Sequence, residues 1–243
     1  MPPTTSTEGS TPPTPTHRGS GNHPPTRQRR RWTRQLAGVV LAGAVSVAAV
    51  ACGGSADHEV GGWVRQPLPV VDTVALPDVS NGDAPFEFTA PPGELLLVYF
   101  GFTFCPDVCP TTLSDLQAAL GELGDDAERV EVAFVTVDPG RDDGEKLTSY
   151  IGFFTDGRGH ALRTEDPELL AAAAEPFGVE YEVTTNEEGE IEVGHTASLF
   201  VVDDRGRLLL TWPFGTPPEV LAGDLAWLLE AEDGAAMEAQ LTT

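Results

Sequence analysis

The sequence predicts an α/β fold in which helices cover both faces of a mixed central sheet. Residues 95–100 (LLLVYF) form a continuous hydrophobic run, as in strands that are buried on both faces of a sheet. Segments with the apolar periodicity of helices alternate with further short apolar strands along the chain. Two cysteines, Cys105 and Cys109, lie between that strand and the next helix, where α/β sheets usually place their functional groups.

Each element follows from a local pattern. A strand is expected at 86–89 and another at 95–100, and a helix then begins near Cys109 and Pro110, since proline lacks an N–H and fits the first helical turn. The other expected elements are a strand at 130–137, helices near 144–154 and 166–175, strands at 179–183, 191–193 and 198–202, a hairpin arm at 207–212 and a helix at 217–230. This order, with cysteines between strand and helix, indicates a thioredoxin-like three-layer sandwich with a mixed central sheet.

Cys105 and Cys109 are the candidate functional residues of the loop. At a helix N-terminus the unpaired N–H groups and the dipole favour a negative neighbour, so we expect both thiolates to form more readily than in a free chain. Residues four apart in a helix-like loop have Cα atoms roughly 6 Å apart, which allows one disulfide or one shared metal ion. A purely structural disulfide is the alternative, but closing so short a loop removes little entropy from the unfolded chain. The pair therefore favours a site.

The charge balance limits the choice of partners. The chain has 243 residues, with 14 basic and 38 acidic side chains. Residues 1–51 hold six arginines and one glutamate, which leaves eight basic and 37 acidic residues after them. Such an acidic surface repels nucleic acid and anionic lipid head groups, so we expect no nucleic-acid partner.

The N-terminal residues have the features of a segment that directs the chain to the membrane. The first 26 residues are rich in Pro, Thr, Ser and Gly, a composition typical of disorder. Five arginines between 27 and 34 precede an uncharged apolar run at 36–51, which is short for a membrane span and fits a signal peptide. The run ends in Ala51-Cys52-Gly53 and resembles a bacterial lipoprotein signal with Cys52 as the lipidated residue. An uncleaved transmembrane anchor and ordinary secretion are the alternatives.

We therefore divide the chain into four parts. They are a basic leader and signal peptide at 1–51, a tether at 52–67, one thioredoxin-like domain at 68–232 and a loose tail at 233–243. All three targeting alternatives place the domain outside the cytoplasm, where disulfides can form. The predicted location is the extracytoplasmic face of the bacterial cell membrane, with a lipid anchor or, alternatively, an N-terminal transmembrane helix. If Cys52 is lipidated, Cys105 and Cys109 remain as an isolated pair.

Three blocks carry a resemblance to a known family. They read Phe102-Thr-Phe-Cys105-Pro-Asp-Val-Cys109-Pro110, Val135-Thr-Val-Asp138-Pro139, and Gly194-His195-Thr-Ala-Ser-Leu-Phe-Val-Val-Asp203. They resemble the signature blocks of the Sco/SenC family, and the similarity extends over residues 68–230. Members of that family are membrane-attached, copper-binding, thioredoxin-like domains that help to assemble the CuA centre of cytochrome c oxidase.

The resemblance implies a site and a set of partners. It implies that Cys105, Cys109 and His195 are the copper ligands, whereas it assigns no role to Asp138, whose position favours a turn former. It further implies a copper donor and a cytochrome c oxidase subunit carrying CuA as partners. The chemistry agrees, because thiolates bind Cu(I) and a thiolate–imidazole set also accepts Cu(II). Zinc could use the same ligands.

The predicted function is thus a metallochaperone, and thiol–disulfide oxidoreductase activity is the alternative. Metal binding needs free thiolates, so a Cys105–Cys109 disulfide would be the inactive form and a thiol reductant is a further expected partner. An oxidoreductase would reduce cysteines of a partner protein. Against it, three residues rather than two separate the cysteines, and the residues before the strand at 198 read His195-Thr196-Ala197 without a proline.

Overall fold

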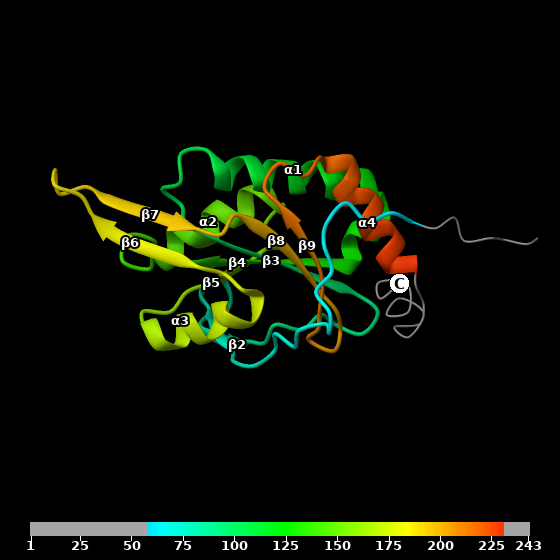
Figure 1. Cartoon of the computed structure of the whole chain (residues 1–243), viewed down its shortest axis with the longest axis horizontal. Helices are drawn as coiled ribbons and strands as arrows, with labels where there is room; N and C mark the ends of the chain where they lie inside the picture. The colour runs from blue at the N-terminus through cyan, green and yellow to red at the C-terminus, as the bar shows by residue number, and fades with distance from the viewer. Residues whose placement is uncertain (1–57, 231–243) are drawn as a thin grey trace, which may run out of the picture. The chain divides into compact units, whose positions relative to one another are not determined.

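A seven-stranded mixed sheet organises residues 58–230, the part of the chain that the computed structural model describes (Figure 1). Its strands lie in the order β2-β1-β5-β4-β3-β8-β9, and β3, β4 and β5 run parallel to one another. A separate two-stranded sheet pairs β6 with β7. The bounds of the strands are β1 Leu76–Asp78, β2 Ala84–Phe86, β3 Leu95–Gly101, β4 Val130–Thr136, β5 His160–Leu162, β6 Tyr181–Thr185, β7 Ile191–His195, β8 Ser198–Val202 and β9 Leu208–Pro213.

Helices cover both faces of this sheet. α1 packs between α2 and α4 on one face, and α3 lies on the other (Figure 1). The bounds are α1 Val108–Leu123, α2 Gly144–Phe154, α3 Pro167–Ala174 and α4 Pro218–Glu230, with short 3-10 helices at Val79–Asn81, Gly124–Arg129 and Glu175–Phe177. The prediction of an α/β fold with a mixed central sheet is therefore confirmed.

The strand and helix around the cysteines form for the reasons that the sequence indicated. All seven residues of β3 are buried, as expected for a strand between two helical layers. α1 buries one stripe of side chains at three- and four-residue spacing: Cys109, Thr112, Leu113, Leu116, Ala119 and Leu120. The helix begins at Val108, one residue before the predicted start, so Cys109 belongs to its first turn.

Three predicted elements differ from the observed ones. The strand expected at 86–89 is β2, which ends at Phe86. The strands expected at 179–183 and 191–193 are β6 and β7, which are shifted or longer and pair with each other as an antiparallel hairpin. His195 is the last residue of β7, opposite Tyr181 and two residues beyond the predicted end of that strand. The two strands continue through polar residues here because backbone hydrogen bonds between them, and not the burial of side chains, hold this hairpin together.

The described part of the predicted tether, residues 58–67, lies against the domain. His58 Nε2 forms a 2.6 Å hydrogen bond with the buried Asp224 of α4, and its ring stacks on that of Trp227. Asp224 also accepts hydrogen bonds from the Gly61 N–H and the Trp212 indole N–H. Each of these bonds pairs a polar group that would be costly to bury alone.

The predicted leader and signal peptide at 1–51, the lipidation residue Cys52, the beginning of the tether and the tail at 233–243 lie outside the described residues. Within residues 58–230, none of the helices combines the length and the apolar composition that a membrane crossing requires.

Candidate metal centre

The fold brings Cys105, Cys109 and His195 together. One ligand atom from each of these side chains lies within 4.8 Å of the other two, and the described residues contain no other such group of three. The Cys109 sulfur is 3.5 Å from Nε2 of His195, although 86 positions separate the two residues in the chain. Both cysteines are unpaired. The three side chains thus form a compact set of two sulfur donors and one nitrogen donor.

Strand pairing explains how His195 reaches the cysteines. β8 lies antiparallel to β3, with Leu199 opposite Tyr99. The residues just before β8 therefore meet the residues just after β3, because antiparallel neighbours join the start of one strand to the end of the other. β7 ends three residues before β8, so its final residue, His195, lies beside the loop that carries Cys105.

The N-terminus of α1 supports Cys105. Asp107 precedes the helix but its side chain makes no capping hydrogen bond. The Cys109 N–H instead donates to the Cys105 sulfur at 3.3 Å. This backbone N–H of the first helical turn therefore points at the Cys105 sulfur and not at a capping carboxylate. Cys105 is also the more exposed of the two cysteines.

Cys109 is in a different environment. It is fully buried, and burial raises the pKa of its thiol to about 12, while a hydrogen bond from the Phe102 backbone opposes that rise. The prediction that both thiolates form more readily than in a free chain is therefore wrong for Cys109, because desolvation outweighs the helix dipole. A metal ion must displace the proton from this sulfur in order to bind it.

The imidazole of His195 is oriented for binding through Nε2. Its Nδ1 lies 3.1 Å from the Thr196 carbonyl oxygen, which can only accept, so Nδ1 carries the proton and Nε2 presents a lone pair toward Cys109. The rings of Tyr99 and Phe102 meet the imidazole edge on, at 6.1 and 5.7 Å between centroids. Burial among these groups lowers the pKa of His195, which keeps the ring neutral and available as a ligand.

Gly101 makes room for the Cys109 sulfur. A methyl group at this position would lie 2.9 Å from Tyr99 Cε1 and 3.0 Å from both the Cys109 sulfur and Phe134 Cζ. We expect Gly101→Ala to destabilise the fold by about 2 kcal/mol, as overpacked cores do, and to displace the thiol. Urea denaturation and the rate of Cys109 alkylation would measure the two effects.

Gly121 provides the control for that prediction. It lies in α1 with open space around it, so Gly121→Ala is expected to stabilise the protein by up to about 1 kcal/mol through helix propensity. If both variants had the same stability, the close approach at Gly101 would have no consequence.

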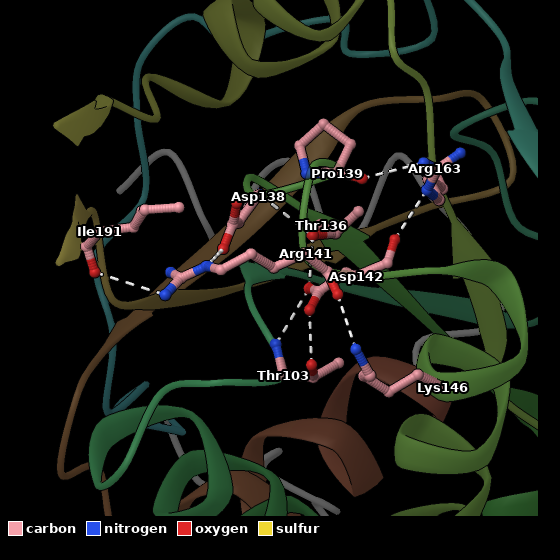
Figure 2. A network of polar contacts seen from close by, with 9 residues as sticks. All are labelled: Thr103, Thr136, Asp138, Pro139, Arg141, Asp142, Lys146, Arg163 and Ile191. Atoms are coloured by element: carbon pink, nitrogen blue, oxygen red, sulfur yellow. Dashed lines mark hydrogen bonds and ion pairs between the residues drawn. The ribbon is translucent and has the colours of Figure 1, made fainter. Parts of the chain in front are cut away.

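A buried carboxylate fixes the cysteine loop. Asp142 is fully buried and accepts hydrogen bonds from the Thr103 N–H at 3.0 Å, from the Thr103 hydroxyl and from the Thr136 hydroxyl at 2.6 Å (Figure 2). Thr103 lies two residues before Cys105 in the chain. Asp142 could not be identified from the sequence, since an aspartate in an acidic turn usually faces solvent.

Asp138 and Arg141 connect this turn to the hairpin. Asp138 is buried and forms an ion pair with Arg141, whose guanidinium also donates to the Ile191 carbonyl oxygen in β7 (Figure 2). The same guanidinium lies 5.2 Å from the centre of the Phe104 ring, next to Cys105. Asp138 is not among the grouped candidate ligands. Its contacts hold the turn and, through Arg141, the strand that carries His195.

Comparison with known proteins shows which family model and which solved structures the chain resembles. Residues 79–230 match the family model described as SCO1/SenC. A solved structure of apo Sco1 from Thermus thermophilus is similar at a TM-score of 0.56 and 37% identity, covering 71% of this chain and 97% of that one. A structure of Bradyrhizobium japonicum ScoI with copper bound is similar at a TM-score of 0.55 and 31% identity, covering 64% and 96%.

A curated relative extends the comparison. A provisionally named copper-binding protein of Stutzerimonas stutzeri is 32% identical over 131 residues, which cover 54% of this chain and 63% of that protein. The chain spans less than two thirds of the length of the curated relatives that it matches.

Proposed function

The chain belongs to the SCO1/SenC family, and from this premise we propose that it is a copper chaperone that holds the ion with Cys105, Cys109 and His195 and delivers it to the CuA centre of cytochrome c oxidase. The single observation that carries the proposal is the convergence of these three ligand atoms within 4.8 Å. Two sulfurs and one imidazole are donors that suit copper in both oxidation states.

Each side chain has a distinct part in binding. Cys109 lies on the buried side of the site, beside His195 Nε2, and anchors the ion there. Cys105 is partly exposed, so it is the sulfur that a donor or recipient protein can reach first. Three protein ligands leave the copper open to an incoming ligand, and a transfer by ligand exchange requires such an opening. The neutral His195 supplies its lone pair without losing a proton.

The redox state of Cys105 and Cys109 controls whether the proposed chaperone can bind copper. Oxidation of the pair would join the two sulfurs in a disulfide, remove two electrons and two protons, and leave only the imidazole as a copper ligand. The disulfide is therefore the inactive form, and a thiol reductant that takes up the oxidising equivalents restores the site. The chaperone consequently needs a reductant as a partner, besides a copper donor and the oxidase subunit that carries CuA.

Copper titration of the reduced full-length chain in detergent tests the proposal. We expect one copper per chain, with a sulfur-to-Cu(II) charge-transfer band, and no band in the Cys105→Ser/Cys109→Ser double variant. The loaded chain should then pass its copper to a metal-free CuA domain of an oxidase, with the CuA absorption as the readout. Failure to bind copper, together with rapid reduction of insulin disulfides, would refute the chaperone and favour the oxidoreductase. A stronger response to zinc than to copper would also refute it.

We also propose that a lipid on Cys52 holds the protein at the extracytoplasmic face of the bacterial membrane. The support is the sequence pattern alone: a basic cluster, an apolar run of signal-peptide length and Cys52 at its end. Mass spectrometry of the membrane-extracted protein would detect a lipid-modified Cys52 as the N-terminal residue. An intact leader would instead identify the apolar run as a transmembrane anchor.

A further inference from the structure

The hydroxyl of Tyr99 is a buried polar group without a role in the fold. Tyr99 lies in β3 and is fully buried, and its hydroxyl has no hydrogen-bond partner within residues 58–230. The large majority of buried polar side-chain atoms in proteins are paired, because an unpaired one has lost its bonds to water without replacement. An unpaired phenol in the most buried strand therefore requires a reason.

Its surroundings suggest one. Cys109 and Thr112 of α1 are its nearest polar neighbours, and neither is placed with the geometry of a hydrogen bond to it. Thr112 already donates its own proton to the Val108 carbonyl at 2.9 Å. The Tyr99 ring meets His195 edge on, and a methyl group at Gly101 would lie against both this ring and the Cys109 sulfur. Separate contacts thus place the phenol beside two of the candidate ligands.

We propose that the Tyr99 hydroxyl donates a hydrogen bond to the Cys109 sulfur once copper has replaced the thiol proton. The proposal rests on the proposed function, since it requires a metal-bound thiolate. In the metal-free protein the sulfur belongs to a neutral thiol, which is a weak acceptor and leaves the hydroxyl unpaired. The bound thiolate carries negative charge and is a much better acceptor.

Such a bond would favour the reduced ion. A donor at the sulfur withdraws electron density from it and stabilises the more negative form of the site. With two thiolates and one neutral imidazole, the Cu(I) form carries one more negative charge than the Cu(II) form. Hydrogen bonds to the ligand sulfur are among the recognised determinants of potential in copper and iron–sulfur proteins. Tyr99 therefore increases the preference of the site for Cu(I) over Cu(II).

Tyr99→Phe in the full-length chain tests this inference, because it removes the hydroxyl and keeps the ring. The sulfur-to-Cu(II) charge-transfer band should move to longer wavelength. The ratio of Cu(I) to Cu(II) affinity should fall about tenfold, as for the loss of other groups that bond to metal ligands, and this corresponds to about 59 mV in a one-electron potential. The metal-free variant should be at least as resistant to urea as the wild type, since it loses an unpaired buried hydroxyl.

Tyr150→Phe is the matched control. The Tyr150 hydroxyl is also buried and unpaired in the described structure, and it is close enough to Cys109 and Cys105 to interact with their charge but makes no hydrogen bond to either sulfur. Tyr150 lies in α2, and its ring packs on Phe134 and Phe154. This variant should leave the band and the affinity ratio unchanged. An unmoved band and ratio in Tyr99→Phe, or an equal shift in both variants, would overturn the inference while wild-type copper binding stands. A wild-type chain that binds no copper would instead refute the proposed function, and the inference would fall with it.

Discussion

His195→Ala is expected to weaken Cu(II) binding by on the order of 100-fold, the upper end of the losses seen when groups around a metal are removed. The imidazole Nε2 faces the Cys109 sulfur at 3.5 Å and has no other described partner in that direction. Its removal leaves two thiolates, which suffice for Cu(I) but not for the higher coordination that Cu(II) prefers. We therefore expect a much smaller loss for Cu(I). Competition titrations with chelators of known affinity would measure both.

His58→Gln is the control for this variant. His58 also has a half-buried ring, but it bonds to Asp224 on α4 and belongs to no ligand group. Its loss should leave both copper affinities unchanged. If His195→Ala bound Cu(II) as tightly as the wild type does, His195 would not be a ligand, and the chaperone proposal would lose the observation on which it depends.

The second large effect is expected at a residue that would not touch the metal. Asp142→Ala leaves three donors without their acceptor: the Thr103 N–H and the hydroxyls of Thr103 and Thr136. Because Asp142 and Thr136 are fully buried, water cannot fully replace these bonds, and we expect a loss of about 3 kcal/mol in the free energy of unfolding. Without these bonds Thr103 and the neighbouring Cys105 would be free to move. If Asp142→Ala still folds, its copper affinity should therefore be lower than that of the wild type.

Asp143→Ala separates this effect from a general loss of charge. Asp143 is the next residue, is 67% exposed and caps α2 through the Lys146 N–H. Its removal should cost far less stability and leave copper binding intact, since it has no contact with the cysteine loop. Urea denaturation of both variants, monitored with and without copper, would distinguish them. Equal losses in the two would mean that the buried carboxylate does not hold the loop.

Local patterns predicted much of the fold. The all-apolar run at 95–100, the apolar stripe of α1 and the capped helix after Asp166 appear in the structure close to their predicted bounds. These elements depend on residues within a few positions of one another, which a periodicity can register. The β6–β7 hairpin was placed less well. Its strands mix glutamates with apolar residues, and their pairing with each other leaves no strong hydrophobic pattern.

The functional group was predictable only in part. The spacing of Cys105 and Cys109 after a buried strand indicated a site without any tertiary information, and the sequence blocks indicated the family. Asp142 gave no signal, because nothing local distinguishes a buried carboxylate from the exposed one beside it. The thiol of Cys109 was expected to ionise easily, and the opposite direction follows from burial, which no local pattern measures.

By itself, then, the sequence determined the strand, the cysteine loop and the helix after it, since near neighbours and their periodicity specify each of them. Only the tertiary structure decided which groups meet at that loop. The antiparallel pairing of β8 with β3 brings His195 across 86 positions to Cys109, and the packing of α1 on β3 leaves the Tyr99 hydroxyl beside the same sulfur. Contacts between residues so far apart in the sequence depend on the order of the strands in the sheet. The whole chain sets that order through the burial of its core.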